Sequence, residues 1–129
     1  MNNEKKPLDL CEVTCVNPDK INQITIQIND NQLQETSILF KGLAEPNRMK
    51  IMRALMIEPE LCVCDAAYLL QVPTANASHH LRSLRQSGLV KYRKEGKLVW
   101  YSLQNERVRL IIEAALLYQE EAGDPYVHG

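Results

Sequence analysis

Residues 75–103 decide the fold, and they read ANASHHLRSLRQSGLVKYRKEGKLVWYSL. In the first half, Ala77, Leu81 and Leu84 recur at the spacing of one helical face, and Gly88 follows where a glycine commonly ends a helix. In the second half, two runs of alternating apolar and polar residues flank the short segment KEGK. This pattern predicts a helix followed by a β-hairpin with a basic tip.

Further helices are expected on both sides of this stretch. Pro46 is well placed to begin a helix with the sequence PNRMKIMRALMI, whose methionines form an apolar stripe for the core. A shorter helix should start near residues 64–65, and a last one should cover residues 106–121. Upstream, Thr36-Ser37 offers an N-cap for the segment ILFKGLA. The isoleucines of residues 21–36 alternate with polar residues, which suggests a strand, but the surroundings are polar. This segment therefore fits either a helix or an extended arm.

The order of these elements is that of a winged helix-turn-helix. We therefore expect a mainly α (α+β) fold with a two-stranded β-wing. The expected division is a mobile N-terminal arm over residues 1–20, a winged-helix DNA-binding and dimerisation domain over residues 21–121, and a C-terminal tail over residues 122–129.

The composition is that of one globular domain. The chain has 129 residues, of which 45% are hydrophobic and 24% are charged, and this excludes a fully disordered protein. No apolar run approaches the roughly 18 residues of a membrane span, and no secretory signal is visible. We expect a cytoplasmic protein whose four cysteines are reduced and available for metal or redox chemistry.

Positive charge is concentrated in one segment. The formal net charge is −1, yet residues 79–97 hold six lysines and arginines against one glutamate, which gives six minus one, or +5. A balanced chain with such a segment is expected to have one anion-facing surface. A solvated basic face is the alternative.

The helix and the hairpin form a candidate DNA-reading surface. Such a helix fits the major groove, where small and polar side chains near its N-terminus reach base edges, while basic hairpin residues contact phosphates. We expect DNA as the partner, with no membrane and no small-molecule substrate; a protein-interaction domain of the same fold is the alternative. The candidate DNA-binding residues are Thr74, Asn76, Ser78, His79, Arg82, Arg93, Lys94 and Lys97.

The adjacent pair His79-His80 is a poor candidate for metal binding. Neighbouring residues of a helix point about 100° apart, so the two rings do not share one ion while the helix stays regular. We expect one of them to face DNA and the other to be packed inside the domain with a hydrogen bond.

Four cysteines in two close pairs are the strongest candidates for site chemistry. Cys11 and Cys15 lie in the arm, and Cys62 and Cys64 lie near the expected start of a helix. Four thiolates suit a four-coordinate site for a soft or borderline cation such as Cd(II), Pb(II) or Zn(II). Residues i and i+2 of a regular helix point about 200° apart. The second pair can converge if it lies at the fraying start of the helix, where Val63 is still extended. Inert buried cysteines or a redox pair are the alternatives.

Several segments resemble the ArsR/SmtB family of metal-sensing transcriptional repressors. Residues 60–65 (ELCVCD) are similar to its metal-binding box. Residues 75–82, residues 93–97 and residues 101–103 are similar to the recognition helix and wing of its cadmium/lead-sensing CadC branch, and the cysteine-bearing arm resembles that branch too. The resemblance implies a homodimeric repressor whose apo form binds operator DNA and is released by metal.

The same resemblance implies an arrangement for the metal ligands. Each four-thiolate site would take Cys11 and Cys15 from one subunit and Cys62 and Cys64 from the other.

A second, zinc-type site that many family members carry on the C-terminal helix is expected to be absent. The matching positions are Asn105, Arg107, Tyr118 and Glu121, of which Glu121 alone is a plausible ligand, and Arg107 would repel a cation. His128 in the tail is weak compensation.

The sequence thus predicts a repressor that leaves its operator when Cd(II), Pb(II) or Zn(II) binds the cysteines. A thiol-based As(III)/Bi(III) or redox sensor on the same scaffold and a cytosolic metal-buffering protein are the alternatives. An enzyme is not expected, because no nucleophile–base pair, phosphate loop or acidic dyad stands out.

Overall fold

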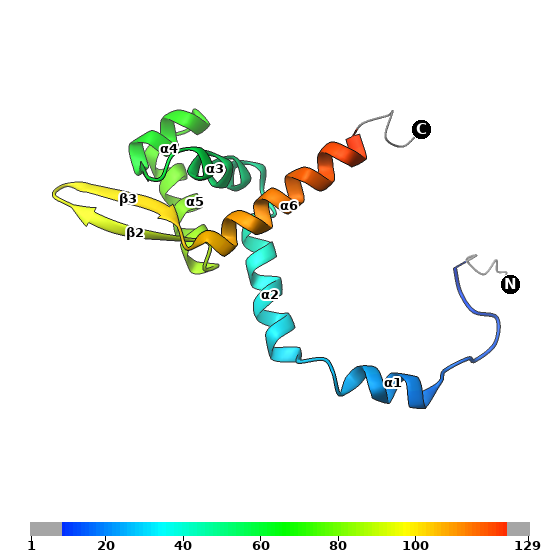
Figure 1. Ribbon diagram of the computed structural model, residues 1–129. Coiled ribbons are helices and arrows are strands. Elements are labelled where there is room, and N and C mark those ends of the chain that lie inside the picture. Colours follow the sequence, from blue (N-terminus) through cyan, green and yellow to red (C-terminus); the bar gives the residue numbers. More distant parts are fainter. Residues whose placement is uncertain (1–8, 124–129) are drawn as a thin grey trace, which may run out of the picture. The chain divides into compact units, whose positions relative to one another are not determined.

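The computed structural model describes residues 9–123 of the chain (Figure 1). The chain divides into two units, residues 1–33 and residues 34–129, which are described in turn. The helices are α1 (Pro18–Thr25), α2 (Asp30–Leu43), α3 (Pro46–Ile57), α4 (Val63–Leu70), α5 (Thr74–Gln86) and α6 (Glu106–Gly123), and the strands are β1 (Leu61–Cys62), β2 (Val90–Glu95) and β3 (Leu98–Leu103).

Helices rather than strands form in the first unit and at its boundary. Asn17 caps α1 by accepting a hydrogen bond from the backbone N–H of Lys20 at 3.1 Å. Asn29 accepts in the same way from the N–H of Gln32 at 3.1 Å, so α2 begins two turns before the cap that we expected at Thr36-Ser37. The extended alternative for residues 21–36 is therefore wrong. Capping by side chains outweighs the alternation of isoleucines, which remain exposed.

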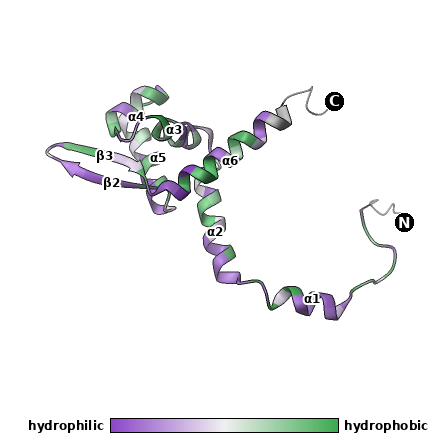
Figure 2. Ribbon diagram, in the orientation of Figure 1, coloured by the Kyte–Doolittle hydropathy of each residue, from purple (hydrophilic) through white to green (hydrophobic). Residues whose placement is uncertain are grey.

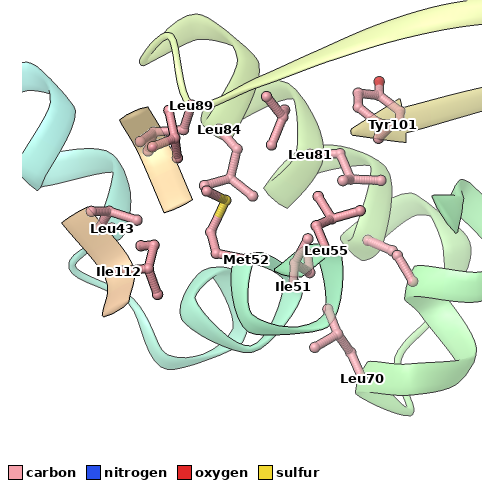
Figure 3. Packing of buried hydrophobic residues seen from close by; sticks show 14 of the residues in the cluster. Leu43, Ile51, Met52, Leu55, Leu70, Leu81, Leu84, Leu89, Tyr101 and Ile112 are labelled. Atoms are coloured by element: carbon pink, nitrogen blue, oxygen red, sulfur yellow. The ribbon is translucent and has the colours of Figure 1, made fainter. Parts of the chain in front are cut away.

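The core of the second unit lies between its helices and the base of the hairpin. Glu45 caps α3 by accepting from the N–H of Arg48 at 2.8 Å, and Gly88, with φ of +79°, follows the end of α5 as predicted. Figure 3 shows the buried side chains converging from these elements, and Met52 of the methionine stripe is among them. Fully buried members of this cluster are Ile51, Met52, Leu55, Leu81, Leu84, Leu89, Val90 and Ile112.

The hairpin is part of a three-stranded antiparallel sheet with the order β1-β3-β2. Strands β2 and β3 pair from Val90 opposite Leu103 to Glu95 opposite Leu98, and Gly96, with φ of +61°, supplies the left-handed residue that the two-residue turn requires. Figure 2 shows that β2 is hydrophilic over most of its length. The sequence did not predict β1, which adds a third strand beside the expected two.

The winged helix-turn-helix fold class is confirmed. In Figure 1 the hairpin projects from the helices beyond α5, the helix predicted to read DNA, and α6 follows it in the chain. The division at residues 20 and 121 that the sequence suggested stays a prediction about how the chain works.

Candidate DNA interface and metal-binding cysteines

The outer face of α5 presents the residues predicted to read bases. Because Ala77, Leu81 and Leu84 are buried on one side of the helix, the opposite side is left open. Thr74, Asn76, His79 and Arg82 are exposed, and Ser78 is half-buried. Arg82 donates a hydrogen bond from Nη1 to Ser78 Oγ at 2.7 Å, so these two side chains form one polar group on the helix surface.

The two histidines of α5 differ in exposure as predicted. His79 is exposed, whereas His80 is half-buried beside the cap of α3, with its Nδ1 atom 3.8 Å from Glu45 Oε1. The prediction of a hydrogen bond for the packed histidine is wrong. Nδ1 of His80 is buried and has no hydrogen-bond partner among the residues that the structure describes.

The three basic residues nearest the hairpin turn fall into two groups. Lys94 and Lys97 are exposed near the turn and have no ion-pair partner in the described part of the chain. Arg93, in contrast, donates from Nε and Nη2 to the two carboxylate oxygens of Glu60 at 2.7 and 2.8 Å, and from Nη1 to Glu95 at 3.2 Å. Hydrogen bonding to Arg93 lowers the pKa of Glu60 below its ordinary value, and the pKa of Arg93 is raised in turn. Lys94 and Lys97 are therefore more available than Arg93 to contact phosphates.

The base of the hairpin is held against α5. The guanidinium of Arg85 lies over the ring of Tyr92, 4.8 Å from its centroid, and Tyr92 stacks on Tyr101 with ring centroids 5.8 Å apart. Tyr101 is only 5% exposed. This cation–π contact and the aromatic stack connect the recognition helix to the sheet.

Cys62 and Cys64 occupy the first turn of α4. Cys62 is the N-cap: its Sγ accepts from the N–H of Asp65 at 3.4 Å, while a carboxylate oxygen of Asp65 accepts from the N–H of Cys62 at 3.2 Å. This capping box starts the helix at Val63, earlier than the predicted residues 64–65. Val63 is therefore helical, and the extended residue is Cys62, with φ of −83° and ψ of 170°. Cys64, the second residue of α4, is exposed.

Cys11 and Cys15 are exposed, and their thiols are in contact. The Cys15 thiol donates to the Cys11 sulfur at 3.3 Å, and this hydrogen bond, with a smaller contribution from desolvation, raises the pKa of Cys15. Sulfurs of a tetrahedral zinc site with Zn–S bonds of about 2.3 Å lie about 3.8 Å apart. The distance between the two sulfurs is thus close to the spacing of two ligands of one such ion.

Each cysteine pair offers two of the four sulfurs that a tetrahedral thiolate site needs. All four cysteines are free thiols, and thiolates are the ligands that soft and borderline cations prefer. Among the described residues, no group of three or more His, Cys, Asp or Glu side chains is placed to hold one metal ion.

Side chains are described at three of the four positions matched to a second site, and none of the three carries a thiol, an imidazole or a carboxylate. Asn105 accepts a hydrogen bond from the N–H of Val108 at 3.2 Å and so caps α6, and Arg107 and Tyr118 are exposed. The side chain of Glu121 and the whole of His128 lie outside the described residues.

The sequence did not indicate two residues that lie beside Cys62 and the hairpin. Glu60 binds Arg93 across 33 positions of the chain, and Trp100 lies opposite Cys62 in the sheet. Their only sequence signal is the position of Glu60 at the start of the ELCVCD segment and of Trp100 within an alternating run. Neither signal indicates a partner.

A helix that presents polar side chains beside a basic hairpin defines a winged helix-turn-helix DNA-binding protein. Residues 45–92 match the family described as bacterial regulatory protein, arsR family. The chain is 46% identical to the cadmium resistance transcriptional regulatory protein CadC homolog of Staphylococcus aureus, over 88% of this chain and 93% of that protein. It is 40% identical to the CadC protein of Listeria innocua, over 94% and 98% of the two chains.

A solved structure supports the same assignment. The homodimeric winged helix-turn-helix DNA-binding domain of a possible ArsR-family transcriptional regulator from Mycobacterium bovis matches with a TM-score of 0.68 and 26% identity, over 71% of this chain and 84% of that chain. The chain belongs to the arsR family of bacterial regulatory proteins. It is a DNA-binding transcriptional regulator and not an enzyme. Among the described residues, no helix has both the length and the apolar character needed to cross a membrane.

Proposed function

We propose that the protein is a metal-sensing repressor that binds operator DNA without metal and is released when Cd(II), Pb(II) or Zn(II) binds its cysteines. The observation that carries this proposal is the position of Cys62 and Cys64 in the first turn of α4, the helix that directly precedes the recognition helix α5. Cys62 and Cys64 would hold an ion at the start of the helix that packs against α5. The two CadC relatives named above, both described as cadmium resistance regulators, support cadmium as one inducer.

The residues present fit such an ion. Cys11 and Cys15 already lie side by side, and Cys62 and Cys64 lie on either side of Val63 at a helix N-terminus, where the helix dipole favours negative groups. When bound, the ion would supply a fixed link between the two thiol pairs. In this role the cysteines bind it as thiolates, so its affinity falls as the pH is lowered and the thiols retain their protons.

The proposed DNA contacts follow from exposure and charge. Thr74, Asn76, Ser78, His79 and Arg82 face the major groove, and Lys94 and Lys97 reach phosphates. Arg93 stays in the proposed set, with the difference that it must share its guanidinium with Glu60.

We propose a homodimer in the cytoplasm. The homodimeric domain from Mycobacterium bovis supports the first part of this proposal. Regulation of transcription requires access to DNA, which supports the second part. A two-fold dimer reads an imperfect palindrome whose half-sites lie about one helical turn apart.

A thiol-based sensor of As(III), Bi(III) or oxidation is the second candidate. The contact between the Cys11 and Cys15 sulfurs favours it, because a close dithiol is also suited to As(III) or to disulfide formation. A metal-buffering protein is disfavoured, since it does not account for the basic hairpin.

The decisive experiment uses a labelled duplex of the gene's own promoter. We expect the reduced protein to bind this duplex tightly by fluorescence anisotropy, and we expect Cd(II) to release it and a chelator to restore binding. Parallel titrations with Pb(II), Zn(II), As(III) and an oxidant rank the inducers. Binding that is insensitive to all the metal ions contradicts the proposal, and a response to As(III) or to the oxidant alone favours the second candidate.

A mixed dimer determines whether each site is shared between subunits. One chain carries Ser at positions 11 and 15, and the other carries Ser at positions 62 and 64. In the crossed arrangement, this heterodimer keeps one site with four sulfurs and one site with none. We therefore expect one tightly bound Cd(II) per heterodimer, measured by the thiolate-to-Cd(II) charge-transfer absorbance.

The alternative arrangement gives a different stoichiometry. If each site lies within one chain, the heterodimer has two half-sites of two sulfurs, and its Cd(II) binds weakly. The two homodimers of the same variants serve as controls, because neither retains a four-sulfur site in either arrangement.

A further inference from the structure

The sheet brings the metal-binding segment and the wing together. Strand β1 pairs with β3 so that Cys62 lies opposite Trp100, and β3 pairs with β2 so that Trp100 lies opposite Arg93. Residues directly opposite each other on neighbouring strands point to the same face of a sheet. Cys62, Trp100 and Arg93 therefore form one row across the three strands.

A salt bridge between Glu60 and Arg93 connects the two ends of this row. Glu60 lies two positions before Cys62 and directly precedes β1. Its carboxylate accepts two hydrogen bonds from Arg93, at 2.7 and 2.8 Å. The bidentate geometry fixes the distance and the orientation between the segment that leads into β1 and strand β2 of the wing.

Because the Glu60–Arg93 pair is exposed to solvent, we expect it to fix the position of the two segments rather than to stabilise the fold. The side chain of Glu60 is 33% exposed and that of Arg93 is 50% exposed, and ion pairs with this much solvent contribute little to the stability of a fold. Strand β1, however, has only two residues, so its backbone ladder alone holds it weakly to the wing. The Glu60–Arg93 pair is a second, directional connection between this segment and the wing.

We propose that Glu60 and Arg93 are positioning residues that transmit metal binding at Cys62 to the wing. This inference rests on the proposed function. When the cysteines are drawn together around an ion, Cys62 moves β1, and the pair carries this displacement to β2. Lys94 and Lys97, next along β2 and its turn, are then withdrawn from the phosphates.

This route differs from the one through α4. A displacement carried only by α4 would tilt the recognition helix and weaken base contacts, and the salt dependence of binding would stay unchanged. Withdrawal of the wing removes phosphate contacts, each of which contributes about 0.9 to the slope of log K against log salt. The two routes are therefore separable by measuring that slope with and without metal.

The test compares Glu60→Gln with Glu95→Gln as a matched control. Both substitutions remove one negative charge and one partner of Arg93, but Glu95 lies at the hairpin turn and has no connection to β1. Operator affinity is measured for each protein over a range of salt, with and without Cd(II). The charge-transfer absorbance and the emission of Trp100, the only tryptophan in the chain, confirm that each variant is folded and loaded.

In the unsubstituted protein and in Glu95→Gln, we expect Cd(II) to release the operator and to lower the slope by about 2 or more. In Glu60→Gln we expect full loading with Cd(II), an unchanged slope, and a release ratio that is reduced about fivefold or more. The double substitution Glu60→Arg with Arg93→Glu, which restores the pair with reversed charges, is expected to recover the slope change.

Three outcomes overturn the inference. In the first, Cd(II) releases the operator from the unsubstituted protein but leaves its salt slope unchanged. In the second, Glu60→Gln responds to Cd(II) like Glu95→Gln. In the third, the protein with the reversed pair shows no more slope change than Glu60→Gln. Failure of the proposed function is distinct from all three, because then the unsubstituted protein itself stays on the operator in Cd(II).

Discussion

A Cys64→Ser protein is expected to bind its operator as tightly as the unsubstituted chain and to stay bound when Cd(II) is added. Serine preserves the size of the side chain, and Cys64 is exposed and takes no part in the capping box that starts α4. Its hydroxyl is, however, a poor ligand for a soft cation. Coupling between two sites usually amounts to about 5–150-fold in affinity, and in this variant we expect less than about twofold. Anisotropy titrations of the promoter duplex with and without Cd(II) measure the difference.

A second variant separates the loss of a ligand from damage to the helix. Asp65→Ala removes the carboxylate that accepts from the N–H of Cys62 and leaves all four thiols in place. It is expected to lose about 0.3–1 kcal/mol of stability and to keep its release by Cd(II). Normal release of Cys64→Ser would place the sensing site elsewhere, and loss of release in Asp65→Ala would mean that the start of the helix, rather than the ligand, controls the response.

Replacing both lysines near the hairpin turn is expected to weaken binding to every DNA sequence. Lys94 and Lys97 are exposed and have no ion-pair partner among the described residues, so they are available to phosphates. A dimer of Lys94→Gln/Lys97→Gln loses four cations. With about 0.9 per phosphate contact, the slope of log K against log salt should fall by about 2–4. The loss should be similar on operator and unrelated duplexes, since phosphate contacts carry little sequence information.

The control for this experiment removes the same charge from another surface. Lys41 in α2 and Lys50 in α3 are exposed and lie outside the hairpin, so Lys41→Gln/Lys50→Gln changes the net charge equally. We expect its salt slope to match that of the unsubstituted protein. Equal slopes in all three proteins would exclude the wing from the DNA contacts.

Local signals in the sequence were sufficient for the recognition helix and the hairpin. The spacing of Ala77, Leu81 and Leu84 and the glycine at position 88 determine α5, and the hairpin turn follows from Gly96 between two alternating runs. In these elements the residues that decide the conformation are close in the chain. The fold class and the family of DNA-binding regulators could therefore be predicted without a structure, and both are confirmed.

Features that depend on distant partners could not be predicted in the same way. A strand of two residues such as β1 has no periodicity of its own and forms because β3 lies beside it. The bond between Glu60 and Arg93 joins residues 33 positions apart, and nothing in either neighbourhood indicates the other. In residues 21–36 the alternation of isoleucines was misleading, because Asn29 and the start of α2 determine a helix there. The role of the four cysteines as metal ligands remains a prediction that rests on their chemistry.

The order of the sheet also affects how the protein behaves in solution. Strand β2 lies at the edge of the sheet that the described residues form, with β3 as its one neighbour there. Such an edge can pair with the edge of another molecule. Lys91, Arg93 and Lys94 all lie on this strand, and lysines on an edge strand oppose that kind of aggregation. The positive charge proposed to attract DNA thus also keeps wings of free molecules apart, which matters most when a repressor has left its operator and its wing is uncovered.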